Sequence, residues 1–254
     1  MTATSSDPIH DVTNQSTPLE DYDSYLSDRV LCETVYLHGA GWARDLLTDA
    51  GYTSAHALHK ADLANRYTPV LHTHDRHGRR RDEVEFHPAW HELLAMSVER
   101  GIISMPWASG ARPGSHVARA ALFYLHSQME AGTQCPIAMS FGAIPVLRRV
   151  AADLPQIDAL WLPKLLSRLY DPRPLPAGEK TGVLFGMGMT ERQGGSDVRR
   201  NVTCATPVNG RGGAGEHYTL RGHKLVLGAD VRRLPGPGTG EKRNIVLSLA
   251  AVSR

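Results

Sequence analysis

The chain has 254 residues, of which 41% are hydrophobic and 21% charged, and its formal net charge at pH 7 is +2. This length allows one or two domains with a sizeable core, and the near balance of charge gives no indication of nucleic-acid or membrane binding. The sequence contains neither a signal peptide nor an apolar run near the roughly 18 residues that a membrane helix needs. The three cysteines lie far apart, so we expect a reduced, cytoplasmic setting. They are Cys32, Cys135 and Cys204.

The first part of the chain is predicted to be helical after a flexible arm at residues 1–23, which is rich in Ser, Thr, Asp and Pro. Apolar residues then recur at helical spacing, and Asp28, Ser54 and Ser115 stand where N-caps are expected. Pro145 interrupts one apolar segment and predicts either two short helices or one kinked helix there. The predicted helices are 29–49, 55–66, 88–100, 116–131, 136–152 and 160–170.

Residues 67–86 contain two short extended runs around a polar turn at 75–78. Histidines and arginines gather there, and two interpretations are open: a metal or phosphate site, or a solvated, positively charged turn. We favour the turn, because no nearby Cys or carboxylate completes a closed coordination set. These residues are His72, His74, His77, Arg79, Arg80 and Arg81.

His87 and His91 lie four residues apart at the start of a predicted helix, a spacing that can hold zinc. The inner glutamate of the His-Glu-x-x-His motif is absent, so capping and packing roles are favoured over a metal site.

From Gly182 onward the pattern changes to short β-branched runs between glycine-rich turns, at 183–185, 202–208 and 218–227. Helices followed by strands predict an α+β protein, in which an all-helical N-terminal domain precedes the start of an antiparallel β domain. The predicted division is an arm at 1–23, a helical domain at 24–181, a partial β domain at 182–228 and an irregular tail at 229–254.

The segment from Gly186 to Val198 reads GMGMTERQGGSDV and follows a short apolar run. Its four glycines and its hydroxyls are typical of backbone that approaches an anion or a flat polar ring, and a surface turn between two strands is the alternative. A dinucleotide-binding fingerprint is excluded, because its third glycine would fall at Glu191 and no helical pattern follows. A phosphate-binding Walker loop is excluded by the missing Gly-Lys-Ser/Thr ending.

This segment resembles the flavin-contacting segment of the acyl-CoA dehydrogenases, Met-Thr-Glu-x-x-x-Gly-Ser-Asp. It is most similar to the AidB branch, the alkylation-response proteins of that family, and similarity extends over roughly residues 18–224. The resemblance implies a helical N-terminal domain, a β domain and a C-terminal four-helix bundle, for which 254 residues leave no room. The other similar segments are 25–28, 39–42, 86–91, 117–121, 130–132 and 222–224.

The resemblance implies FAD as the cofactor and an acyl-CoA thioester as the substrate. The implied reaction removes a proton α to the thioester and passes a hydride from the β carbon to flavin N5. In this mapping the backbone of 187–190 lies against the flavin pyrimidine edge, Thr190 lies between flavin and substrate, and Ser196 binds the pyrophosphate. The family's glutamate base lies beyond residue 254, so no catalytic residue is assigned. The implied cofactor-binding residues are Met187, Gly188, Met189, Thr190, Glu191, Gly194, Gly195 and Ser196.

After Lys224 the chain departs from the AidB branch, which continues Trp-Phe-x-Ser where residues 225–228 read LVLG. Divergence is one explanation. A shifted reading frame is the other, because a family-like continuation read one nucleotide out of frame can give residues 225–238. With these flavin contacts and the bundle missing, we expect weak FAD binding. Two other functions are open: a non-catalytic remnant whose helical domain associates with other copies, and a DNA-alkylation-response protein that binds nucleic acid, by analogy alone.

Overall fold

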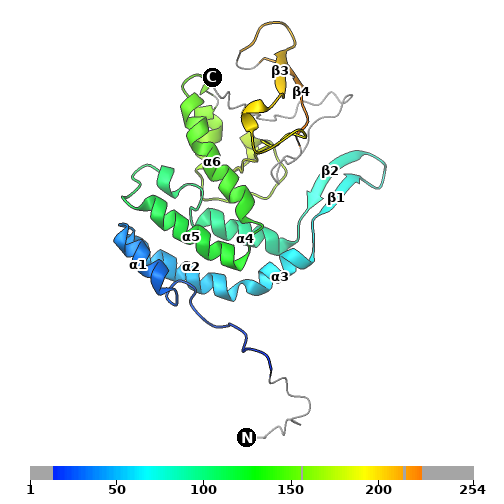
Figure 1. The fold of residues 1–254 in the computed structure, drawn as a ribbon. Coiled ribbons are helices and arrows are strands. Elements are labelled where there is room, and N and C mark those ends of the chain that lie inside the picture. Colours follow the sequence, from blue (N-terminus) through cyan, green and yellow to red (C-terminus); the bar gives the residue numbers. More distant parts are fainter. Residues whose placement is uncertain (1–13, 156, 214–215, 225–254) are drawn as a thin grey trace, which may run out of the picture.

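The computed structural model describes residues 14–155, 157–213 and 216–224 of the chain. Most of its regular structure is helical, and the strands form two small antiparallel sheets of two strands each (Figure 1). The expected α+β fold class is therefore confirmed. Part of the predicted arm, residues 1–13, and the predicted tail with its proposed frameshift, residues 225–254, lie outside the described residues.

The helices and strands follow one another along the chain in a helix-rich order. They are α1 (Arg29–Leu37), α2 (Arg44–His56), α3 (Leu58–Arg66), β1 (Val70–His74), β2 (Arg80–Glu85), α4 (Pro88–Glu99), α5 (Ser115–Met129), α6 (Gln134–Val150), α7 (Leu162–Leu165), β3 (Cys204–Pro207) and β4 (Tyr218–Arg221). Short helical turns lie at Gly41–Ala43, Met105–Trp107, Ile157–Trp161, Ala177–Glu179 and Val198–Arg200.

The prediction of one helix over 29–49 is wrong, because the chain forms two helices there, α1 and α2. Gly39 has a φ of +76°, in the left-handed region that favours glycine, and this conformation ends α1. The predicted cap is confirmed, since Asp28 Oδ1 accepts a hydrogen bond from the Leu31 N–H at 2.9 Å.

The predicted helix start at Ser54 is also wrong. Ser54 lies in the last turn of α2 and is 2% exposed, on the same face as the buried Leu47 and Ala50. Because this face continues into the core, α2 continues with it, and the break falls at Ala57. The predicted end before Tyr67 is confirmed.

The N-termini of α4 and α5 differ in how far the sequence predicted them. His87 caps α4, its Nδ1 accepting from the Ala89 N–H at 3.2 Å, and a proline occupies the first helical position as expected. Ser115 is not the cap of α5 but its first residue. The cap position belongs to Gly114, and the Ser115 hydroxyl donates to the Arg112 carbonyl at 2.6 Å instead.

Two later helices also differ from their predictions. The segment predicted as two short helices or a kinked helix forms one helix, α6, with Pro145 inside it. The helix predicted over 160–170 is shorter, because α7 ends at Leu165. Beyond it the Ser167 Oγ accepts from the Leu169 N–H at 3.1 Å, a local bond that replaces helical pairing.

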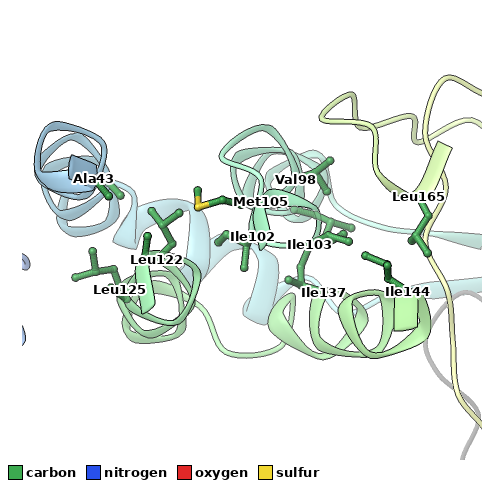
Figure 2. Close-up of a cluster of buried hydrophobic side chains, with 14 of the residues drawn as sticks. Ala43, Val98, Ile102, Ile103, Met105, Leu122, Leu125, Ile137, Ile144 and Leu165 are labelled. Carbon is green, nitrogen blue, oxygen red and sulfur yellow. The ribbon is translucent and has the colours of Figure 1, made fainter. Parts of the chain in front are cut away.

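The main core lies between the helices, with α2 and α5 packed together and α3 beside α4 (Figure 1). Ile102 and Ile103, in the connection after α4, are 0% and 2% exposed, and Figure 2 shows them among side chains from α5 and α6. The same cluster includes Val183 and Phe185. The segment that follows the helices is therefore packed onto them from its start. The labelled side chains in Figure 2 are Ala43, Val98, Ile102, Ile103, Met105, Leu122, Leu125, Ile137, Ile144 and Leu165.

Strands β1 and β2 form a hairpin that projects from the helices (Figure 1). Asp75 stabilises its turn, since its Oδ1 accepts from the N–H groups of His77 at 2.8 Å and Arg79 at 2.9 Å. The predicted pair of extended runs is thus confirmed. Strands β3 and β4 pair from Cys204 with Arg221 to Pro207 with Tyr218. Within the described ranges, no helix has the length and apolar character needed to cross a membrane.

Candidate functional site

The segment that carries the candidate site is first fixed at Asp171, whose residue is 6% exposed. The Arg173 side chain donates to this carboxylate from Nε at 2.8 Å and from Nη2 at 2.7 Å, and the Thr181 N–H donates at 3.0 Å. The hydrogen bonds from Arg173 and from the Thr181 backbone hold the pKa of Asp171 well below its ordinary value. This charged carboxylate thereby positions residue 181, where the segment begins.

Residues 183–185 then attach the segment to the helices. Val183 and Phe185 are 9% and 8% exposed and pack into the main core. The Val183 N–H donates to the Lys164 carbonyl in α7 at 3.2 Å, and the Phe185 N–H donates to Ser140 Oγ in α6 at 2.9 Å. The predicted strand at 183–185 is therefore wrong, because its backbone pairs with helical residues and not with another strand.

After Phe185 the chain opens to solvent. Met187 and Met189 are 37% and 50% exposed, while Gly188 and Thr190 are half-buried. In the part of the chain that the structure describes, the backbone N–H groups of residues 187–190 donate no hydrogen bond. Such a row of N–H groups can donate to an anion or to the polar edge of a ring, because the flanking glycines leave room for close approach.

The far end of this open stretch is fixed by Glu191, which is 1% exposed. Its carboxylate accepts from the Val202 N–H at 2.8 Å, the Thr203 N–H at 3.0 Å and the Lys224 ammonium at 2.9 Å. The Thr203 hydroxyl and the Gln193 amide also donate to it. These donors, first among them the Thr203 hydroxyl, hold the pKa of Glu191 far below its ordinary value. Glu191 thus organises the turn as a charged, fully paired carboxylate.

Two side chains from the β part hold the peptide before this turn. Asn201 Nδ2 and Lys224 Nζ both donate to the Met189 carbonyl, at 2.8 Å and 3.2 Å. On the other side of the loop, a Cβ at Gly195 would lie 3.0 Å from Thr190 Cγ2, so this close approach requires glycine. The backbone at 189–190 is therefore fixed from two sides while its N–H groups stay open.

The structure brings most of the predicted cofactor-binding residues into one loop, running from Met187 through Gly195. Ser196 follows at the exposed end of this loop. Glu191 differs from the others, because its carboxylate is occupied by protein donors and only its backbone borders the open stretch.

Sequence reasoning missed three residues that position the loop, namely Ser140, Asp171 and Asn201. One signal was available for Ser140, a small polar residue inside the apolar run that became α6. No comparable signal marked Asp171 or Asn201, because each acts on residues ten or more positions away.

The histidines singled out in the sequence have structural partners. His72 Nε2 lies 2.6 Å from Glu85 Oε2 across the hairpin, His87 caps α4, and His91 Nδ1 lies 2.7 Å from the Tyr170 hydroxyl. A shallow groove of about 480 Å³ lies beside His72, His74 and the tip of the hairpin. Within the described residues, no group of three or more His, Cys, Asp or Glu side chains could hold a metal ion.

Two solved structures share this architecture. One, "Bd2924 apo-form", superposes with a TM-score of 0.66 at 31% identity and covers 80% of this chain and 39% of that one. The other is Caenorhabditis elegans ACDH-11 in complex with C11-CoA, with a TM-score of 0.70 over 85% of this chain and 36% of that one. At 23% identity the second match shows the fold alone. The fold is that of the acyl-CoA dehydrogenases.

The family within this class follows from sequence. Residues 14–172 match the family described as "Adaptive response protein AidB N-terminal domain". The Escherichia coli (strain K12) protein "Putative acyl-CoA dehydrogenase AidB" is 46% identical over 217 residues, 85% of this chain. The Caenorhabditis elegans "Acyl-CoA dehydrogenase family member 11" is 27% identical over 203 residues, 79% of this chain. The chain belongs to the AidB family. It spans 39% and 30% of the length of these two relatives.

Proposed function

We propose that this chain carries the flavin-binding segment of an FAD-dependent acyl-CoA dehydrogenase of the AidB type. The observation that supports it is the row of open N–H groups at 187–190, held between the buried anchors Phe185 and Glu191. We further propose a cytoplasmic setting and the division into an arm at 1–23, a helical domain at 24–181, a partial β domain at 182–228 and a tail at 229–254.

The residues of the loop fit the chemistry of FAD. The pyrimidine edge of a flavin presents carbonyl oxygens and ring nitrogens, which can accept from the open N–H groups of 187–190. Gly195 brings the following backbone close to Thr190, and the exposed hydroxyl of Ser196 is available to a pyrophosphate oxygen. Three glycines keep this surface free of side chains that would block a flat ring. They are Gly188, Gly194 and Gly195.

FAD supplies the hydride acceptor when it is bound. In this proposal the backbone of 187–190 binds and orients the cofactor, Thr190 faces the space between cofactor and substrate, and Ser196 binds phosphate oxygen. The substrate is an acyl-CoA thioester, which is supported by the C11-CoA complex of the C. elegans relative. We assign no residue of this chain as the base that removes the α proton.

A titration of FAD, followed by the fluorescence anisotropy of the flavin, tests this function. Thr190→Val keeps the shape of the side chain and removes its hydroxyl. We expect the dissociation constant of the altered chain to be at least about tenfold higher, the loss of one well-placed hydrogen bond. Thr206→Val, at an exposed position of β3 outside the loop, is the matched control and should leave the constant unchanged. Equal constants for both variants and the unaltered chain would contradict the proposal.

A second candidate function, association between copies of the chain, is favoured by one observation on α1. Val30, Tyr36 and Leu37 are each 76% exposed, a high value for large apolar side chains. Sedimentation velocity of the chain and of Val30→Glu/Leu37→Glu tests it. A concentration-dependent oligomer that the double variant abolishes is the expected result, and a monomer at all concentrations would contradict it.

A further inference from the structure

A buried polar cluster joins three helices at a distance along the chain from the proposed flavin segment. His126 in α5 is fully buried, and its Nδ1 lies 3.0 Å from Ser97 Oγ in α4. Gln134 in α6 donates from Nε2 to the same hydroxyl at 3.1 Å. One nitrogen of the imidazole is therefore paired within the protein.

Three other polar atoms of this region have no protein partner among the described residues. They are His126 Nε2, Arg100 Nε and Ser54 Oγ. Ser54 is 2% exposed, and the Arg100 side chain is 13% exposed. Buried polar groups in folded proteins are nearly always hydrogen-bonded to protein or to ordered water, so three unpaired atoms in one region require a partner.

The contacts of the neighbouring atoms indicate that these three atoms face one another. Ser97 and Arg100 lie three residues apart on α4, so they share a face. Arg100 Nη2 donates to Thr53 Oγ1 of α2 at 2.9 Å, which brings the guanidinium beside Ser54. Burial, with a contribution from the nearby Arg100 charge, lowers the pKa of His126 to about 3. The guanidinium thus also lies near the imidazole.

The hydrogen bonds that are present also define what the missing partner must do. The Ser97 hydroxyl donates to the Leu93 carbonyl at 3.5 Å, so it accepts from His126 Nδ1–H. This tautomer leaves His126 Nε2 as an acceptor, while Arg100 Nε carries a hydrogen to donate. A partner between them must accept one hydrogen bond and donate another.

We propose that an internal water molecule binds between α2, α4 and α5, contacting His126, Arg100 and Ser54. The water accepts from Arg100 Nε–H, donates to His126 Nε2 and exchanges its remaining hydrogen bond with Ser54 Oγ. Three partners are typical of a buried water, and each of the three comes from a different helix segment. The water therefore completes a polar link across the helical core.

A crystal structure of the full chain at high resolution tests the site directly. We expect a single water peak within hydrogen-bond distance of all three atoms, and its loss in His126→Phe. A dry contact, or a direct hydrogen bond between the Ser54 hydroxyl and His126, would overturn the proposal.

A double-mutant cycle tests the same link in solution, because two residues that share a water are coupled without touching. We expect the effects of Ser54→Ala and His126→Phe on the unfolding equilibrium constant to depart from multiplicativity by at least about fivefold. The control cycle pairs His126→Phe with Ser115→Ala, eleven residues away and about 16 Å along the same helix. Effects that multiply in both cycles would count against a shared water.

Discussion

The hydroxyl of Ser140 in α6 accepts the backbone N–H of Phe185 at 2.9 Å, forty-five residues further along the chain. Both groups are buried, and the Phe185 ring packs edge-on against Trp161 at 5.6 Å between centroids. This contact places the start of the open loop at a fixed point on the helices. The loop is thus held by the helical core as well as by its own turn.

Ser140→Ala should destabilise the chain by about 1–3 kcal/mol, because it leaves the buried N–H of Phe185 without a partner. Urea denaturation measures this change, and hydrogen exchange at the Phe185 amide should accelerate in the same variant. Ser127→Ala, which removes a bond from a half-buried hydroxyl to the Phe123 carbonyl within α5, is the matched control. Unaltered exchange at Phe185 would show that Ser140 does not anchor the loop.

Glu191→Gln should loosen the turn at the far end of the loop, because a neutral amide cannot serve the five donors around the carboxylate. We expect trypsin to cleave faster after the exposed Arg192 and Arg199 in this variant than in the unaltered chain. Glu179→Gln, at an exposed position outside the turn, should leave these rates unchanged. If both variants are cleaved at the same rate, Glu191 does not organise the turn.

The same carboxylate predicts an acid dependence with a definite sign. Its pKa is lowered in the folded chain, so its contribution to stability is fully present above its unfolded pKa of about 4.5 and declines as the pH falls below that value. Trypsin is inactive there, so pepsin cleavage of the turn between pH 5 and pH 3 is the suitable measurement. Faster cleavage at pH 3, with no such change in Glu191→Gln, is the expected result.

His126 predicts a second pH dependence at higher pH. Burial lowers its folded pKa to about 3, so between about pH 6.5 and pH 3 the unfolded chain binds a proton that the folded chain does not. The unfolding equilibrium constant should therefore rise by up to about tenfold per pH unit on acidification through this range. His126→Gln should remove this component of the slope, and His38→Gln, at an exposed position, should retain it. Identical slopes in both variants would contradict a buried neutral imidazole.

The core described in Figure 2 makes a prediction about helical stability. Ile102→Ala should cost about 2–5 kcal/mol, because the side chain is fully buried and its removal leaves a cavity. Val30→Ala, at a position that is 76% exposed, should stay within about 0.5 kcal/mol of the unaltered chain. Denaturation of the two variants side by side measures the difference, and equal losses would show that the core is placed wrongly.

Local signals in the sequence predicted local structure well. Asp28 and His87 each bond a backbone N–H two or three residues away, so their capping roles follow from nearby positions alone. The turn at Asp75 has the same local origin. The α+β class also followed from the order of periodic segments, because helical spacing precedes β-branched runs along the chain.

The failures arose where a distant contact outweighed a local pattern. The apolar spacing that continued to Trp42 and Leu46 favoured one long helix, while Gly39 ended it, and Trp42 instead donates to the Pro113 carbonyl at 2.9 Å. The run at 183–185 read as a strand because β-branched and apolar residues suit one. Its partners are Ser140 and Lys164, which no window of the sequence around residue 185 contains.

The central claim is that the open loop at 186–196 is where FAD binds. Amide chemical shifts of the isotopically labelled full chain, followed as FAD is added to millimolar concentration, test it directly and detect even weak binding. We predict that the largest shifts fall on the amides of residues 187–190 and of Ser196, while those of the β1–β2 hairpin stay in place. Shifts confined to other parts of the chain, or none at any FAD concentration, would contradict the account.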